Sequence, residues 1–339
     1  MARRFSVVLG VAGAALIVGA AAVEYVLAPE LTKFPDDTNI KLAYARTASL
    51  LNAEALQAGD MQEIFLQDVP ITIQRRIKVE KATGDTAAVS DDQIIKGEQV
   101  TSPIEHTYAV DRSSLQMRSS FNDTKVEKSS GCLAIGFPLA PKANDSYTFY
   151  DPSTQKCFKA DYKSSDSVRD LEVHNYTVTA TGPTKDPKIL ANLPPVLPKQ
   201  AVAGIASTLP KDLQEQLGAS LDSLPDPVPM TYLSDTYIKV AADQATGFPV
   251  GQDLQLKTTM ALEVDGTAVP IMPVFDVKAS MTPESVKSLS NDAASTGQLI
   301  RLVDTILPLG LLILGLLLVA VAVVRERRRS GHQDGTPIT

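Results

Sequence analysis

The chain has no tryptophan, and aromatic residues make up only 5% of its 339 residues. Surfaces that stack sugars or nucleic-acid bases are built from aromatic rings, so such a surface is not expected. The net charge of −7 adds a second argument, because nucleic-acid backbones are bound by clustered Lys and Arg side chains. We therefore expect no nucleic-acid partner.

Histidines are also few. None of the three stands in a metal-ligand spacing such as H-x3-H or HExxH, and G-x-S-x-G, GxGxxG and phosphate-loop motifs do not occur. His106 and His174 fall in expected strands, where alternation can place a histidine on a solvated face, and His332 lies in the C-terminal tail. The sequence therefore indicates no catalytic residue, no metal site and no cofactor, and it does not identify ligand-binding residues.

Acidic residues are plentiful, but their clusters suggest no active site. Asp36-Asp37 and Asp91-Asp92 fall in expected turns, where carboxylates usually serve solvation. A pair of catalytic acids brought together from distant segments, as in glycosidases, stays open as an enzyme alternative. We expect a protein that is not an enzyme.

Charge is absent from two long hydrophobic runs, Phe5–Val23 and Ile306–Val324, each of 19 residues. About 20 helical residues cross a hydrocarbon core of roughly 30 Å, so both runs are expected to be transmembrane helices. For the first run a cleaved signal peptide is the alternative, with a cleavage site at Ala20-Ala21-Ala22. The hydrophobic part of a signal peptide is usually about 7–15 residues, which favours an uncleaved anchor.

Basic residues flank both runs on their outer sides. Arg3 and Arg4 precede the first run, and four arginines within 325–339 follow the second. Basic flanks stay in the cytoplasm, which predicts a two-pass plasma-membrane protein with cytoplasmic ends at 1–4 and 325–339. Residues 28–304 are then extracytoplasmic, on the periplasmic side.

Only two cysteines occur, Cys132 and Cys157, and both fall in the region expected outside. An even number of cysteines in an oxidising compartment favours a disulfide, here closing a loop of about 25 residues. Two reduced, buried thiols are the alternative.

The region between the two runs is predicted to be α+β, mainly β, with a curled or barrel-like sheet and a few helices. Short β-rich runs separated by turn residues, without βα alternation, carry this prediction. Residues 39–59 fit either a helix or a strand. The expected strands are 71–79, 106–110, 146–150, 172–180, 236–240, 254–264 and 273–281.

Helices are expected at 200–207 and 210–224, within a proline-rich stretch. The second has a leucine stripe from Leu209 to Leu224, which suits either a lid over an apolar cavity or a helix packed on the sheet. A last helix is expected after Thr282, with four apolar residues facing the domain: Val286, Leu289, Ala293 and Leu299.

Several short segments resemble a family of actinobacterial envelope proteins known as the porin PorA family, which includes the LmcA-like lipoglycan proteins. The resemblance covers nearly the whole chain, although Tyr150 stands where the family prefers tryptophan. The matching residues are Tyr108-Ala109-Val110-Asp111-Arg112, Gly136-Phe137-Pro138, Tyr147, Tyr150-Asp151-Pro152, Tyr162, Thr246-Gly247 and Leu307-Pro308.

The resemblance implies a barrel-like extracytoplasmic domain with an apolar cavity, and a role in maturing lipomannan and lipoarabinomannan. We therefore expect a non-enzymatic envelope-assembly protein whose partner is a membrane lipid or glycolipid. The alternative is a membrane scaffold that holds a glycosyltransferase or a transporter. A pore is not expected, because neither hydrophobic run contains a charged or strongly polar residue that would line an ion path.

Overall fold

The computed structural model describes residues 2–52, 55, 63–97, 101–221, 223–264 and 266–330. The chain divides into two compact units. One consists of Met1–Lys33 with Ala294–Thr339, and its described residues are mainly helical; the other, Phe34–Ala293, is built mainly from strands and is called the β domain here.

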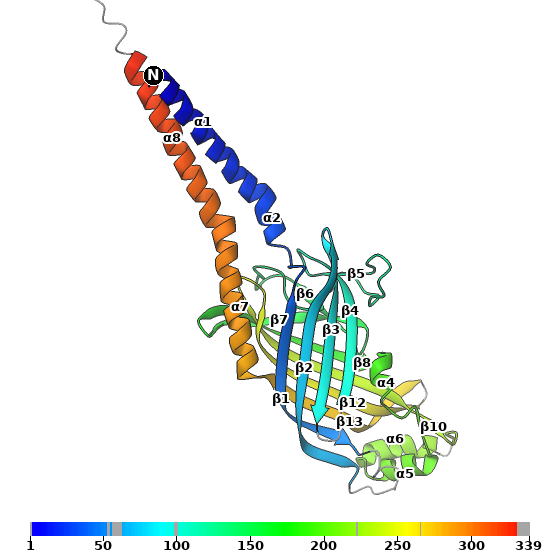
Figure 1. Cartoon of the computed structure of the whole chain (residues 1–339). Coiled ribbons are helices and arrows are strands. Elements are labelled where there is room, and N and C mark those ends of the chain that lie inside the picture. Colours follow the sequence, from blue (N-terminus) through cyan, green and yellow to red (C-terminus); the bar gives the residue numbers. More distant parts are fainter. Residues whose placement is uncertain are drawn as a thin grey trace, which may run out of the picture. The chain divides into compact units, whose positions relative to one another are not determined.

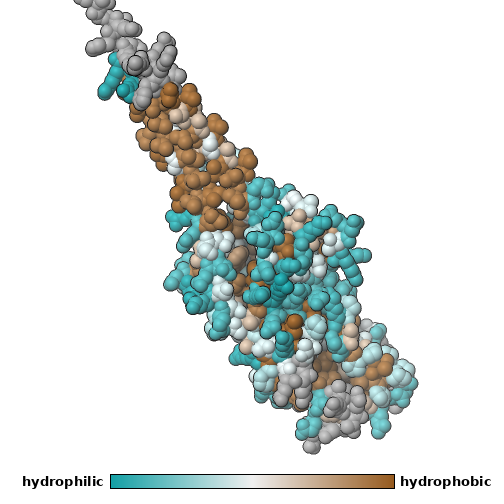
Figure 2. All heavy atoms as spheres, viewed as in Figure 1, coloured by the Kyte–Doolittle hydropathy of each residue, from teal (hydrophilic) through white to brown (hydrophobic). Residues whose placement is uncertain are grey.

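Two helical stretches, Val11–Leu31 and Pro283–Arg328, are long and apolar enough to cross a membrane; the second begins in the β domain and continues into the helical unit. The two predicted runs are therefore helical, and Figure 2 shows hydrophobic residues covering this pair of helices. Their elements are α1 (Ala2–Ala22), η1 (Val23–Leu27), α2 (Ala28–Leu31), α7 (Pro283–Arg301), η2 (Leu302–Ile306) and α8 (Leu307–Ser330).

Each helical stretch contains one π-helical turn that ends two residues before a proline. The turn η1 precedes Pro29, and η2 precedes Pro308. In an α-helix the ring of a proline clashes with the carbonyl four residues earlier, and it also removes one hydrogen bond. Widening the helix to a π turn relieves this clash without breaking the helix.

The helices α1 and α8 pack closely where Gly13 meets Gly315. A Cβ atom added to Gly13 would lie 2.6 Å from the carbonyl oxygen of Gly315, and the reverse distance is 2.7 Å. Only residues without a side chain let two helix backbones approach this closely. Gly19 on α1 and Gly310 on α8 have no such neighbour within 4 Å.

The β domain contains an 11-stranded antiparallel sheet in the order β5-β4-β3-β2-β1-β13-β12-β11-β8-β7-β6 (Figure 1). All seven predicted strands are confirmed, while β3, β5 and β7 were missed and the ambiguous segment begins as β1. The strands are β1 (Asn39–Leu51), β2 (Phe65–Thr83), β3 (Thr86–Gly97), β4 (Thr101–Asp111), β5 (Met117–Arg118), β6 (Tyr147–Asp151), β7 (Lys156–Val168), β8 (Leu171–Pro183), β11 (Thr231–Asp243), β12 (Pro249–Val264) and β13 (Thr267–Met281).

The sheet curls, as the predicted mainly β, barrel-like class requires (Figure 1). Long strands bend at irregularities in their pairing, for example between Ala48 and Leu50 in β1 and between Val79 and Lys81 in β2. An extra residue in one strand of a pair increases the local twist and bends the strand. The curl therefore follows from bulges placed within the longest strands.

The two edge strands of the sheet, β5 and β6, are connected by the segment 131–133. The Met117 amide donates to the carbonyl of Cys132 at 2.7 Å, and the Tyr150 amide donates to the carbonyl of Leu133 at 2.8 Å. The predicted disulfide between Cys132 and Cys157 is confirmed, and it ties this segment to β7. The two edges are thus joined at this point of the sheet.

Helices and a small β-ribbon lie between β8 and β11 in the chain, and the two helices predicted there are confirmed. On α6 the side chain of Leu217 is fully buried, and Leu209, Leu213 and Leu224 are partly buried in the same cluster. The side chain of Leu221 lies outside the described residues. The elements are α4 (Pro187–Leu190), β9 (Val196–Leu197), α5 (Lys199–Ser207), α6 (Lys211–Leu221) and β10 (Val228–Pro229).

The helix α7 begins as predicted after Thr282, whose hydroxyl accepts a hydrogen bond from the Ser285 amide at 3.3 Å. Leu289 and Ala293 are buried in the main core of the β domain. The prediction that Leu299 also faces the domain is wrong, since this side chain is 58% exposed. The reason is its position beyond Ala293, where the helix has left the β domain.

We predict that Gly13→Leu separates α1 from α8. A leucine side chain there must push against the backbone of Gly315, which forces the helices toward the usual interaxial distance of about 8–10 Å. Spin labels at the exposed positions Val11 and Val321 report the change as a longer distance distribution. Gly19→Leu is the matched control; equal distributions for the two variants contradict the assigned contact.

We predict that replacing Cys132 and Cys157 together by serine lowers the free energy of unfolding of the β domain by about 3 kcal/mol, the loop-entropy contribution of such a cross-link. Urea denaturation followed by circular dichroism measures the loss. Reduced wild-type protein should match the double variant, and an unchanged denaturation midpoint in both would show that the disulfide does not stabilise the domain.

Candidate functional site

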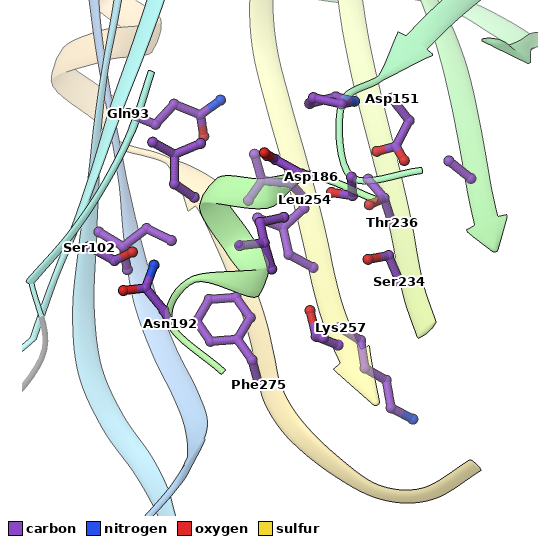
Figure 3. Close-up of a pocket in the computed structure, with 18 of the residues that line it drawn as sticks. Gln93, Ser102, Asp151, Asp186, Asn192, Ser234, Thr236, Leu254, Lys257 and Phe275 are labelled. Atoms are coloured by element: carbon purple, nitrogen blue, oxygen red, sulfur yellow. The ribbon is translucent and has the colours of Figure 1, made fainter. Parts of the chain in front are cut away.

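The β domain contains a cavity of about 1020 Å³, bounded by the inner face of the curled sheet and by the segment 186–204. Its lining is mostly apolar and includes Ile95, Phe149, Ile238, Leu254 and Phe275. Figure 3 shows α4 between two groups of strands that carry labelled lining side chains. Polar side chains reach the same cavity at several points.

A buried ion pair lies in the cavity wall. The Arg75 guanidinium donates two hydrogen bonds to the carboxylate of Asp91, Nε to Oδ1 at 2.8 Å and Nη2 to Oδ2 at 2.7 Å. Burial lowers the pKa of Arg75, but the adjacent carboxylate outweighs it and the net shift is upward. The assignment of Asp91-Asp92 to a turn is therefore wrong: both lie in β3, where Arg75 compensates the buried charge.

The alternation of residues along β2 indicates this pair, although no sequence motif describes it. Inward positions of β2 alternate as Ile71, Ile73, Arg75, Ile77 and Val79, so a single charge interrupts an apolar series. A charged residue at an inward strand position requires a partner inside, because an unpaired buried charge is costly. The pattern predicts a pair without identifying its partner.

Tyr44 extends this polar group across the sheet. Its hydroxyl donates to the side-chain carbonyl of Gln252 on β12 at 2.6 Å, and burial raises the pKa of the phenol. Tyr108 on β4 also lines the cavity, and its ring lies 6.1 Å from that of His106. Polar side chains from β1, β2, β3, β4 and β12 therefore meet the cavity.

His106 is buried with only 3% exposure, so the prediction of a solvated face is wrong for this residue. Its Nδ1 lies 2.9 Å from the Glu127 carboxylate, and its Nε2 lies 3.3 Å from Oδ2 of Asp186. Asp186 is itself buried and caps α4, since its Oδ1 accepts from the Lys188 amide at 2.9 Å. The Lys188 ammonium lies 3.5 Å from the His106 ring.

The two carboxylates beside His106 decide how this cluster titrates. Burial lowers the pKa of His106, but the adjacent carboxylates of Asp186 and Glu127 outweigh it, and the net shift is upward. Burial raises the pKa of Asp186, but His106 and the Lys188 amide outweigh that effect, and the net shift is downward. Both shifts favour the charged forms of the pair.

A third buried carboxylate, Asp151, lines the cavity at the end of β6. It accepts from the amide of Thr154 at 2.8 Å and from its hydroxyl at 2.7 Å, and burial nevertheless raises its pKa. Two hydroxyls of β11, those of Ser234 and Thr236, line the same wall (Figure 3). The Ser234 hydroxyl is also 2.7 Å from that of Thr184.

The same Asp-x-x-Ser/Thr turn occurs at the ends of β4, β6 and β11. In each turn one carboxylate oxygen binds both the amide and the hydroxyl of the residue three positions later. The pairs are Asp111 with Ser114, Asp151 with Thr154, and Asp243 with Thr246. Asp111 and Asp151 belong to the segments that resemble the PorA family. Their hydrogen bonds indicate that these segments form turns that end strands.

The remaining predicted residues lie away from the cavity lining. His174 is on β8, with its ring nitrogen 2.9 Å from the hydroxyl of Ser165. His332 lies outside the described residues. Within the described part of the chain no three His, Cys, Asp or Glu side chains group as metal ligands do.

A family model described as Porin PorA matches residues 5–324. The chain belongs to this family. The match covers both candidate membrane helices and the whole β domain, so it confirms the resemblance stated from the sequence motifs. It also makes the chain an envelope protein by family, without indicating what the cavity holds.

The other comparisons add little. No curated protein matches the chain. A crystal structure of a conserved protein of unknown function with a hot dog fold, from Alicyclobacillus acidocaldarius, is 14% identical, and the alignment covers 77% of this chain and 90% of that one. Its TM-score is 0.12, so the likeness gives no information about the fold of this chain.

We predict that His106→Gln destabilises the β domain more at pH 5.5 than at pH 9. His106 has a higher pKa in the folded protein than in the unfolded chain, so its protonation stabilises the fold at pH values below the unfolded pKa of about 6.5. This stabilisation is lost as the pH rises through the folded pKa. The lowered pKa of Asp186 acts oppositely and stabilises the fold above about 3.9.

Urea denaturation of wild type and variant at the two pH values measures the difference. When His106→Gln is introduced into the Asp186→Asn variant, its cost in unfolding free energy should depend less on pH, because His106 has already lost one of its two carboxylates. An equal cost of His106→Gln at both pH values contradicts the assigned role of the carboxylates.

Proposed function

We propose that the β domain binds a membrane lipid or glycolipid in its cavity and serves envelope assembly without catalysing a reaction. The observation that carries this proposal is the cavity of about 1020 Å³ with its mostly apolar lining. Ligand pockets usually measure about 300–1,000 Å³, so this one lies at the upper end of the range. An apolar space of this size suits hydrocarbon chains.

The polar side chains of the cavity give the proposed ligand a second point of attachment. Arg75, Asp91, His106 and Asp186 line the same space as the apolar residues. A lipid has an apolar part and a polar headgroup, so a cavity with both kinds of lining matches an amphiphile better than a pure hydrocarbon. The lipomannan and lipoarabinomannan pathway implied by the family resemblance would supply such ligands.

The placement at a membrane supports the same proposal. The arginines outside the two candidate spans favour cytoplasmic termini and an extracytoplasmic β domain. A domain anchored at both ends stays close to the bilayer surface from which a lipid would be taken.

A membrane-spanning pore is a weaker candidate, despite the family's name. Outward positions of β2 carry polar and charged residues, including Gln74, Arg76 and Glu80. A transmembrane barrel needs an apolar outer band about 25 Å tall, which these residues would interrupt. The outer face of the sheet is therefore suited to water.

Enzyme and scaffold functions are also weaker candidates. The carboxylates of Asp91, Asp151 and Asp186 line the cavity, yet each is already bound by donors from the protein. A scaffold would be expected to bind its partners through the glycines of the two helices, but Gly13 and Gly315 already pack against each other. A scaffold does not need the cavity, and an enzyme would need cavity carboxylates that are not already held by protein donors.

We predict that Ile238→Trp, which fills the cavity, weakens lipid binding about 10-fold or more, as overpacking costs about 1–3 kcal/mol. Tyr237→Trp is the matched control, because Tyr237 is the neighbouring residue of β11 but is 41% exposed. Mass spectrometry of full-length protein purified in mild detergent measures bound lipid. Wild type without lipid, or equal lipid in the two variants, contradicts the proposal.

A further inference from the structure

We infer that the ligand carries hydroxyl groups on its headgroup and that one of them binds between Nε2 of His106 and Oδ2 of Asp186. This inference rests on the proposed lipid-binding function and adds the chemical class of the headgroup. It depends on two buried polar atoms that the protein itself leaves unsatisfied.

Both atoms are fully buried, and neither makes a hydrogen bond with a described residue; the 3.3 Å contact between them is an ion pair only. Both side chains are about 3% exposed, and both residues line the cavity. Buried polar atoms without partners are rare in folded proteins, so each requires an explanation. A ligand in the cavity supplies one.

The donors and acceptors of the pair select a hydroxyl. A carboxylate only accepts, so Glu127 binds the Nδ1–H of His106, the protonated ring also carries a hydrogen on Nε2, and Oδ2 of Asp186 requires a donor. A hydroxyl donates to Asp186 and accepts from the imidazolium Nε2–H at the same time. A fully ionised phosphate cannot donate to Asp186, and an ammonium group cannot accept.

The charges around the pair also favour a neutral headgroup. Glu127 and Asp186 face His106 from two sides, Lys188 lies 3.5 Å from its ring, and Asp91 is its cross-strand neighbour. Asp91 is already neutralised by Arg75, so the cluster has no excess of positive charge for a phosphate. A sugar or another polyol fits this balance.

Further hydroxyl-binding groups line the same cavity. Ser234 and Thr236 project from β11, and Asp151 lies at the end of β6 (Figure 3). A polyol headgroup presents several hydroxyls at once, so it can use more than one of these partners. The geometry therefore matches a glycosylated lipid rather than a simple diacylglycerol.

The test uses full-length protein in mild detergent and four probes. Three lipids share the same acyl chains: monoglucosyl-diacylglycerol, diacylglycerol and phosphatidic acid; the fourth probe is methyl glucoside. We expect the glucosyl lipid to bind about 10-fold or more tightly than the other two lipids, as a hydrogen bond to a charged group allows. Methyl glucoside alone should bind only weakly.

Asp186→Asn should abolish this preference while keeping the binding of diacylglycerol, since asparagine caps a helix as well as aspartate does. His106→Gln should do the same. The controls are Asp243→Asn, a buried carboxylate outside the cavity lining, and His174→Gln; both should keep the preference.

Equal binding of the three lipids by wild type, or an unchanged preference in Asp186→Asn, would overturn the hydroxyl site and leave the proposed function standing. Binding of none of the three lipids would overturn both. Methyl glucoside binding as tightly as the glucosyl lipid would assign the site to a free sugar and overturn the lipid proposal.

Discussion

The antiparallel pairing of β1 with β13 is the contact on which the β domain depends. It joins the strands before it in the sheet to those after it, with Tyr44 opposite Met281 and Leu50 opposite Phe275. Without it the two halves of the sheet would be joined only through the segment 131–133 and through side-chain contacts such as that of His106 with Asp186. Because β1 and β13 are adjacent, the chain enters and leaves the β domain side by side. The amide of Thr282 at the start of α7 donates to the carbonyl of Ala43 in β1 at 2.8 Å.

Successive side chains of each strand point to opposite faces of the curled sheet, so one face meets solvent and the other lines the interior. Outward residues such as Arg76 meet solvent, and inward residues such as Ile73 line the core or the cavity. The few polar residues at inward positions then become conspicuous. Arg75 is compensated by Asp91, whereas His106 and Asp186 keep one atom each without a partner. Such atoms are rare in folded proteins, since burying a polar group without a hydrogen bond is costly, and they support the proposed ligand site.

Much of the fold was predictable because it rests on local patterns. Apolar alternation identified β2, β12 and β13, and turn residues separated them correctly. The strand β7 was missed because its sequence, with Lys156, Lys163 and several serines, has a polar outer face and little apolar alternation. Asp91 was assigned to a turn because aspartate is common in turns. Its place in a strand follows only once its buried partner Arg75 is known. The three Asp-x-x-Ser/Thr turns were not recognised from the sequence, although Asp111 and Asp151 lie in segments that resemble the family.

The sequence by itself determined the two hydrophobic helices, the acidic β-rich region between them and the single disulfide, since each follows from composition or from a count. Only the tertiary structure decided which residues meet in the cavity. Arg75 and Asp91 are 16 residues apart, and His106 and Asp186 are 80 residues apart; strand order and the position of α4 bring each pair together. Long-range proximity depends on topology and register, and a one-residue shift in either strand would turn these side chains to the opposite face.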